Sequence, residues 1–197
     1  MSKGEQTHQM ILERAAQVFS RQGYFGSSLS DLMRETGLEK GGIYNHFRSK
    51  DDLALEAFDY SIALVWQRVE QELVGKTNGV DRLIAMLTAY RSLLEDPLLS
   101  GGCPLLNTAV ESDDAHPALR ERAQQAMNRW RKWIQRNVER GIAARDIRPE
   151  VEGDLLATIL ITTVEGAVMM SKLYGDALYL KQAIDYLIRY IQANVRA

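Results

Sequence analysis

Apolar residues recur along most of this chain at steps of three and four, which is the spacing of one buried face of an α-helix. The first such stripe runs through Ile11, Ala15, Val18 and Phe19 and closes at Gly23. Further stripes predict helices over residues 28–36, 40–47, 52–73, 80–94, 105–110, 118–142, 149–173 and 180–195. No segment has the strict alternation of a half-buried strand, so we expect an all-α fold of about nine helices.

Two of the expected helices are short and lie on either side of Gly37. Ser28 and Asp31 have the spacing of a capping box at a helix start, and Gly37 is a typical helix stop. Ser49 and Asp52 repeat the capping-box spacing before the first long helix. Two short helices joined by a tight turn are the pattern of a helix-turn-helix, although a plain helical hairpin has the same spacing.

Charge and cysteine content narrow the class of protein. The net charge of the 197 residues is −2, which excludes a polybasic coat for nucleic acid. Residues 1–50 nevertheless hold seven Lys/Arg against five Asp/Glu, a balance of +2. The single cysteine excludes an internal disulfide framework, and the first residues lack an apolar signal core. The long apolar stretch 155–173 contains Glu165, so we expect a helix buried in protein, no membrane partner and a cytoplasmic location.

The segment from Ser27 to Leu53, "SSLSDLMRETGLEKGGIYNHFRSKDDL", resembles the DNA-binding motif of the TetR family of transcriptional repressors. The matching features are the Gly-x-x-x-Gly pair after the turn, then Tyr44, His46-Phe47 and Ser49-Lys50. The resemblance covers residues 8–55; beyond them only the size, the helical pattern and the two apolar terminal helices match. It implies an N-terminal three-helix helix-turn-helix DNA-binding domain over residues 1–50. A larger helical ligand-binding and dimerisation domain would follow over residues 51–197.

The expected DNA contacts lie on and around the second short helix. A larger residue in place of Gly41 or Gly42 would hold the backbone of this helix away from the major groove, whereas glycine permits close approach. Lys40 and Asn45 are candidates for base edges, because Lys pairs with guanine and Asn with adenine. The resemblance assigns phosphate contacts to Tyr44, His46 and Lys50, and Ser28 would cap the first helix and offer its hydroxyl to phosphate. Glu39 departs from the pattern, since it places an acid close to phosphate, whereas Ile43 and Phe47 are expected in the core.

The resemblance also implies partners: double-stranded operator DNA, a small-molecule inducer and a second copy of the chain. In the family the last two long helices pair with those of the partner subunit to form a four-helix bundle. Here those helices would be 155–173 and 180–195, with the stripe of Ile184, Leu187, Ile188 and Ile191 at the subunit interface of a homodimer. Burial within one chain is the alternative for the apolar helix 155–173.

The ligand is expected to be apolar or aromatic, in a cavity between the helix of Trp130 and that of Thr162. The candidate lining residues combine aromatic, sulfur-containing and isolated polar side chains: Cys103, Asn107, Met127, Trp130, Trp133, Thr162, Glu165 and Met169. Trp and Met at helical spacing also suit a plain core. Cys103 has two interpretations, a small buried hydrophobe or a thiol that senses electrophiles or oxidants.

Two other classes of function fit the sequence less well than a ligand-responsive repressor. An enzyme would need more than Cys103 and His116, because the sequence has no third group to orient them, no phosphate loop and no metal cluster. We therefore expect no catalytic residues, no metal and no cofactor. A helical adaptor that binds proteins is disfavoured by the helix-turn-helix pattern and the local positive charge.

Overall fold

The computed structural model describes residues 1–197 as nine α-helices that form two compact units. The first unit contains residues 1–64 and 95–125, and the second contains residues 65–94 and 126–197. The all-α prediction is confirmed, because β-pairing is limited to one isolated bridge between Ile147 and Arg196. The boundary at residue 50 between the DNA-binding domain and the ligand-binding domain stays a prediction, because these two units are defined by packing and not by function.

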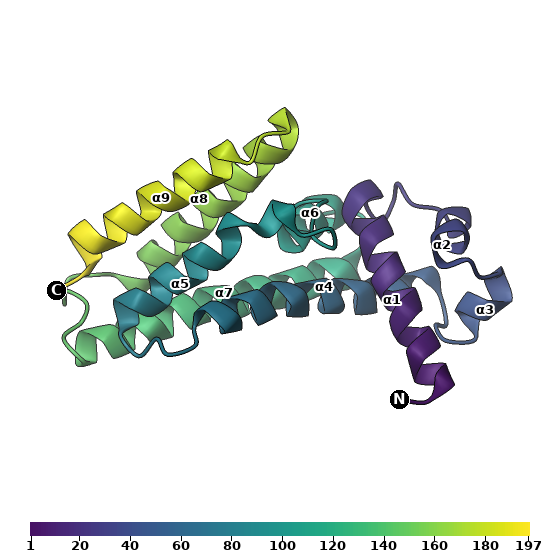
Figure 1. Ribbon diagram of the computed structural model, residues 1–197, viewed down its shortest axis with the longest axis horizontal. Helices are drawn as coiled ribbons and strands as arrows, with labels where there is room; N and C mark the ends of the chain where they lie inside the picture. The colour runs from purple at the N-terminus through teal and green to yellow at the C-terminus, as the bar shows by residue number, and fades with distance from the viewer. The chain divides into compact units, whose positions relative to one another are not determined.

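The first unit is built from the N-terminal helices and a later pair (Figure 1). It holds α1 (Lys3–Gln22), α2 (Leu29–Thr36), α3 (Lys40–Tyr44), the first part of α4 (Lys50–Glu72), α6 (Pro104–Ser112) and the start of α7 (Pro117–Ala143). Its N-terminal core joins apolar residues of α1 to α4: Ile11, Leu12, Ala15, Ala16, Val18, Leu32, Ile43, Phe47, Leu53 and Ala57. Burying one side chain such as Phe47, which is 1% exposed, stabilises this core by roughly 2–3 kcal/mol.

The second unit contains the remaining helices. They are the end of α4, α5 (Gly79–Arg91), most of α7, α8 (Gly153–Tyr174) and α9 (Leu178–Tyr190), with a 3₁₀ turn at Leu93–Glu95 and a π-helical turn at Ile191–Val195. α8 and α9 lie side by side, and α5 packs against α9 (Figure 1). Trp130 of α7 stacks flat on Tyr90 of α5 with ring centroids 5.0 Å apart, and its Nε1 donates to the sulfur of Met86 at 3.2 Å.

The predicted helix start at Pro149 is wrong, because α8 begins at Gly153. Ile147 and Arg148 instead pair with the end of the chain. The backbone N–H of Arg148 donates to the carbonyl of Val195 at 3.0 Å, and its guanidinium donates to the carbonyls of Arg196 and Ala193. Since these bonds fix residue 148 and a turn follows at residues 149–150, the helix starts one turn later than the proline suggested.

α8 is long and apolar enough, by length and composition, to cross a membrane. One side of it is buried in the second unit, including Leu160, Val164 and Glu165. The other side is exposed, so the helix is amphipathic in its packing although its sequence is apolar almost all round.

Candidate functional site

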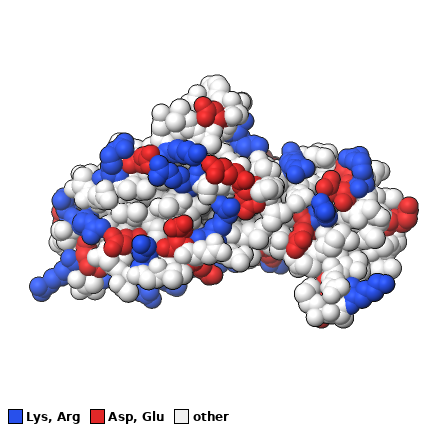
Figure 2. Space-filling view, viewed as in Figure 1, with Lys and Arg blue, Asp and Glu red and all other residues white.

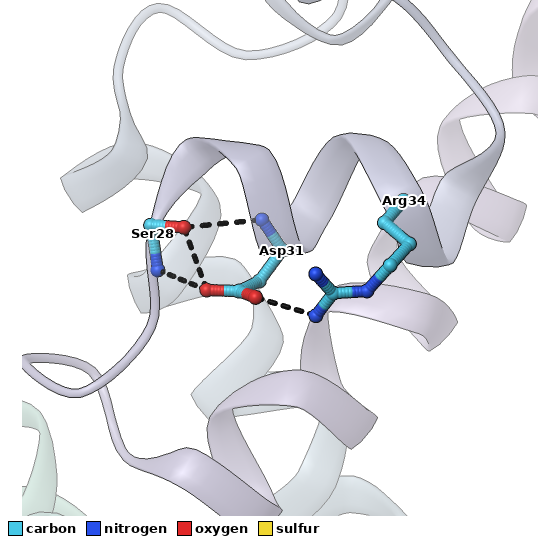
Figure 3. A network of polar contacts seen from close by, with 3 residues as sticks. All are labelled: Ser28, Asp31 and Arg34. Atoms are coloured by element: carbon cyan, nitrogen blue, oxygen red, sulfur yellow. Dashed lines mark hydrogen bonds and ion pairs between the residues drawn. The ribbon is translucent and has the colours of Figure 1, made fainter.

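A capping box starts the first helix of the expected motif, as the sequence predicted (Figure 3). The Ser28 hydroxyl accepts from the backbone N–H of Asp31 at 3.1 Å, and the Asp31 carboxylate accepts from the Ser28 N–H at 2.9 Å. The same hydroxyl donates to Asp31 at 2.6 Å, and Arg34 pairs with the other carboxylate oxygen. The hydrogen bonds from Ser28, followed by that from Arg34, lower the pKa of Asp31 to about 2. This local network fixes where α2 begins.

Gly37 ends α2 in the left-handed conformation, with φ of 70°, and its N–H donates to the Met33 carbonyl at 2.9 Å. The following helix, α3, is shorter than the predicted 40–47, because it ends at Tyr44. The chain tightens there, since the N–H of His46 donates to the Ile43 carbonyl only three residues back. Ile43 and Phe47 are each 1% exposed, which confirms that they hold the motif together.

The opposite side of α3 is open. Lys40, Gly41 and Asn45 are exposed, whereas Tyr44 and His46 are half-buried. A Cβ atom added to Gly41 would meet no atom within 4 Å, so packing within the protein does not require glycine there. A Cβ atom on Gly42 would lie 3.3 Å from Leu38. The small size of Gly41 therefore leaves a bare strip of backbone that faces outward.

His8 of α1, which the sequence analysis did not single out, supports the end of the motif. Its ring stacks on Phe47 with centroids 4.5 Å apart and meets His46 edge-on at 6.1 Å. Its Nε2 lies 3.3 Å from a carboxylate oxygen of Glu56 on α4. The orientation of His46 thus depends on side chains from two other helices, which helical spacing alone does not reveal.

Lys50 points back into the protein, although the resemblance assigned it to phosphate. Its Nζ donates to the backbone carbonyls of Tyr24 and Ser27, both at 2.6 Å, and lies 4.3 Å from the centre of the Tyr24 ring. Burial lowers the pKa of this lysine. In the free protein Lys50 therefore ties the start of α4 to the loop between α1 and α2.

The same loop is held from α6 by Glu111. One carboxylate oxygen accepts from the backbone N–H of Tyr24 and the other from that of Phe25, each at 2.8 Å. Gly23 allows this approach, because it has φ of 76° and a Cβ atom there would lie 2.5 Å from the carboxylate. The Tyr24 hydroxyl bonds to Asp51, and burial followed by that bond raises the pKa of Tyr24 to about 12. We call this set, Gly23, Tyr24, Phe25 and Glu111, the loop clamp.

Comparison with known proteins places these features in a family. The family model described as "Bacterial regulatory proteins, tetR family" matches residues 11–57, which contain α2 and α3. The model described as "Tetracyclin repressor-like, C-terminal domain" matches residues 79–187. The chain belongs to the TetR family. It is a helix-turn-helix transcriptional regulator of a non-enzymatic family, which removes the enzyme and adaptor alternatives.

Individual relatives agree with this assignment over nearly the whole chain. The structure of a TetR transcriptional regulator from Chloroflexus aurantiacus J-10-FL is 48% identical, with a TM-score of 0.94 over 100% of this chain and 99% of that one. A TetR-family regulator from Cytophaga hutchinsonii is 34% identical, with a TM-score of 0.86 over 99% and 98%. The HTH-type transcriptional repressor DhaR of Mycobacterium sp. (strain GP1) is 28% identical over 167 residues, 84% of this chain and 82% of the relative.

The predicted ligand residues of this TetR-family regulator fall in both units. In the first unit, Cys103 is 1% exposed and immediately precedes α6, and the amide of Asn107 donates to the Gly101 carbonyl at 3.1 Å. In the second unit, Trp130 is buried against Tyr90, and Met127 is half-buried.

The remaining candidates of the second unit do not share one environment. Trp133 is half-buried beside Trp66, with ring centroids 6.1 Å apart. Glu165 lies on the buried side of α8, whereas Thr162 and Met169 lie on its exposed side, Met169 being 56% exposed. Thr162 and Met169 therefore do not line a cavity inside one chain.

The stripe expected at the subunit interface is also placed differently. Ile184, Leu187 and Ile191 are buried within the chain, so the prediction that they form the seam between subunits is wrong, and Ile188 of the same stripe is half-buried. Other apolar side chains of α8 and α9 are exposed instead: Leu155, Ile159, Met169, Met170, Leu173, Tyr174, Leu178, Tyr186 and Tyr190. The turn that joins the two helices, at the top of Figure 2, is mostly free of charged side chains. Elsewhere on the face drawn in Figure 2, basic and acidic side chains are interspersed.

Proposed function

We propose that this TetR-family protein is a repressor that binds palindromic operator DNA as a homodimer and releases it when a small apolar or aromatic ligand binds. The observation that carries the dimeric part is the exposed apolar stripe on α8 and α9. On α8 the stripe follows Ile159, Thr162, Gly166, Met170 and Leu173, at steps of three, four, four and three, which is the spacing of a helix seam. Nothing lies within 4 Å of a Cβ atom added to Gly166, so a partner helix has room to approach closely.

The DNA contacts proposed from the motif are consistent with the exposed side of α3. Lys40 and Asn45 would reach base edges, and Gly41 and Gly42 would let the backbone approach the groove. Tyr44, His46 and Ser28 would contact phosphates. The proposed phosphate contact of Lys50 requires its ammonium group to leave the two carbonyls that it binds in the free protein.

A selection from random double-stranded DNA tests the operator proposal. The purified chain should enrich a palindrome with two half-sites, and light scattering during gel filtration should give twice the mass of one chain. Ile159→Glu should produce monomers and weaken operator binding sharply, because two half-sites are no longer engaged together. Val74→Glu is the matched control, since Val74 is 78% exposed but lies outside α8 and α9. An unchanged dimer in Ile159→Glu would place the interface elsewhere.

Operator variants test which residues read bases. Lys40→Ala and Asn45→Ala should each relax the preference at one base pair per half-site, at a cost of about 1–3 kcal/mol there. Tyr44→Phe should weaken binding to all variants alike, as the loss of a phosphate contact does. Uniform effects of Lys40→Ala and Asn45→Ala across the variants would remove them from base recognition.

The non-covalent ligand is favoured over a thiol sensor by the burial of Cys103. A reactive thiol has to meet its electrophile, and a side chain that is 1% exposed does not do so in this conformation. Release of DNA further requires that the ligand bind one conformation of the protein more tightly than the other.

A further inference from the structure

An apolar cleft that opens to solvent lies within the first unit. Its walls come from the end of α1, the first half of α4, α6 and the start of α7. The lining residues are Ala16, Phe19, Ser20, Tyr24, Phe25, Ala54, Ala57, Phe58, Ser61, Pro104, Asn107, Thr108, Glu111, Ser112 and Leu119. Of the ligand residues predicted from the sequence, only Asn107 is among them.

The polar groups of this cleft are largely occupied by the protein itself. The hydroxyl of Ser61 donates to the Ala57 carbonyl, that of Ser112 to the Thr108 carbonyl, and the amide of Asn107 to Gly101. Each oxygen of Glu111 accepts a backbone N–H. The surface that remains for a ligand is therefore chiefly the rings of Phe19 and Phe58 and the methyl groups of small residues, which favours an apolar molecule.

The charge of the lining excludes one class of ligand. No Lys, Arg or His lines the cleft, and its single charged group is the carboxylate of Glu111. An anion placed there would lose its hydration without gaining a cation, and it would lie near a like charge. A neutral molecule meets no such penalty, and an organic cation is attracted by the carboxylate and by the faces of aromatic rings.

Two residues that line the cleft, Ser20 and Glu111, also make very close contacts that join α1 and its loop to α6 and the segment before it. At one, a Cβ atom on Gly101 would lie 2.0 Å from the carbonyl oxygen of Ser20. At the other, a Cβ atom on Gly23 would lie 2.5 Å from Glu111, in the loop clamp. A molecule that widens the cleft has to strain one of these contacts, and the loop clamp leads directly into α2.

We infer that this cleft is a ligand site for a compact apolar or aromatic molecule, neutral or cationic but not anionic, and that its occupancy loosens the loop clamp and lowers affinity for DNA. The binding part stands without the proposed function, whereas the effect on DNA rests on it. The coupling between the two sites is reciprocal, so bound DNA lowers the affinity for the ligand by the same factor.

Three probes that share a ring system and differ in charge test the site. 2-Naphthylmethylamine is a cation at neutral pH, 2-naphthalenemethanol is neutral and 2-naphthoate is an anion. Calorimetry on the full chain without DNA should show the cation and the alcohol binding at least about tenfold more tightly than the anion. Equal binding of 2-naphthoate, or no binding of any probe at millimolar concentration, would overturn the assignment.

Two tryptophan variants on the same helix locate the probes. Thr108→Trp fills the cleft and should weaken the amine and the alcohol at least about tenfold. Val110→Trp places the same side chain two residues away at a position that is 72% exposed, and should leave binding unchanged. Unweakened binding in folded Thr108→Trp refutes the site. If that variant does not fold, nuclear Overhauser contacts between naphthyl protons and the Phe58 ring in the unchanged protein decide, and their absence refutes it.

The effect on DNA is measured separately, with the operator obtained by selection. The amine should raise the Kd for operator DNA in the unchanged protein and in Val110→Trp, but not in Thr108→Trp. Binding of the amine without any change in DNA affinity refutes the regulatory part alone. A chain that binds no DNA at all contradicts the proposed function and leaves the calorimetric result standing.

Discussion

Replacement of Lys50 by alanine distinguishes a lysine that holds the protein together from one that only meets DNA. In the structure its ammonium group donates to the carbonyls of Tyr24 and Ser27, both at 2.6 Å, and lies over the Tyr24 ring. Ser27 is buried, so its carbonyl has little access to water once the lysine is gone. Lys50→Ala should therefore destabilise the protein in the absence of any DNA.

The size of the effect follows from the two bonds and the cost of burying the charge. A hydrogen bond from a charged donor contributes about 1.5–3 kcal/mol, and two would give about 3–6 kcal/mol as an upper bound. The lowered pKa of Lys50 shows that burial disfavours its charged form, and this penalty reduces the sum. We expect a net loss of about 2 kcal/mol, which for a chain of this length lowers Tm by about 4–8 °C.

Lys40→Ala is the matched control, because Lys40 is exposed and lies 5.8 Å from the centre of the Tyr44 ring. Its free energy of unfolding should change by no more than about 0.5 kcal/mol. Calorimetric melting of both variants without DNA, followed by operator binding at several salt concentrations, gives the comparison. If Lys50→Ala has the same Tm as the unchanged protein and only reduces the salt dependence of operator binding, the bonds from Lys50 to the loop contribute nothing to stability. The role of Lys50 is then that of a phosphate contact alone.

Three further changes test other parts of the structure. Gly41→Ala should leave Tm unchanged or raise it, because alanine stabilises a helix by up to about 1 kcal/mol over glycine, while operator affinity in a binding titration falls; unchanged affinity would mean that the backbone does not approach DNA there. The unchanged protein should lose stability as the pH falls from about 4 towards 2, where Asp31 with its pKa of about 2 takes up a proton, and Asp31→Asn should lose less over that interval in acid melts. Cys103→Ser should keep its response to ligand, and Cys103 in the unchanged protein should gain mass from iodoacetamide only slowly until the chain is unfolded; rapid labelling of the native protein with loss of DNA binding would support the thiol sensor.

Local contacts explain what the sequence by itself determined. The Ser28–Asp31 capping box and the stop at Gly37 involve residues at most a few positions apart, so their spacing already specifies the geometry. The burial of Ile43 and Phe47 follows from the same periodicity. The family was also evident from the sequence, because its motif is a continuous stretch of residues.

Even short-range sequence patterns predicted the structure incompletely where a second interaction competes for the same residues. At the second capping box the Ser49 hydroxyl accepts from Asp52 as expected, but the Asp52 carboxylate accepts from Arg48 instead of Ser49. Likewise Pro149 suits a helix start, yet pairing with the chain end delays α8.

Tertiary structure alone decided the features that depend on residues far apart in the chain. Glu111 meets the backbone of Tyr24 across 87 positions, and no periodicity predicts which carboxylate reaches which amide. Lys50 turns towards the loop because that loop exposes two carbonyls to it. Ile184 and Leu187 are buried within the chain, and Ile159 and Leu173 are exposed, because the packing of α8, α9 and α5 selects one of several apolar faces. A helix that is apolar almost all round can bury any of its faces, so only its neighbours determine which face remains for a partner.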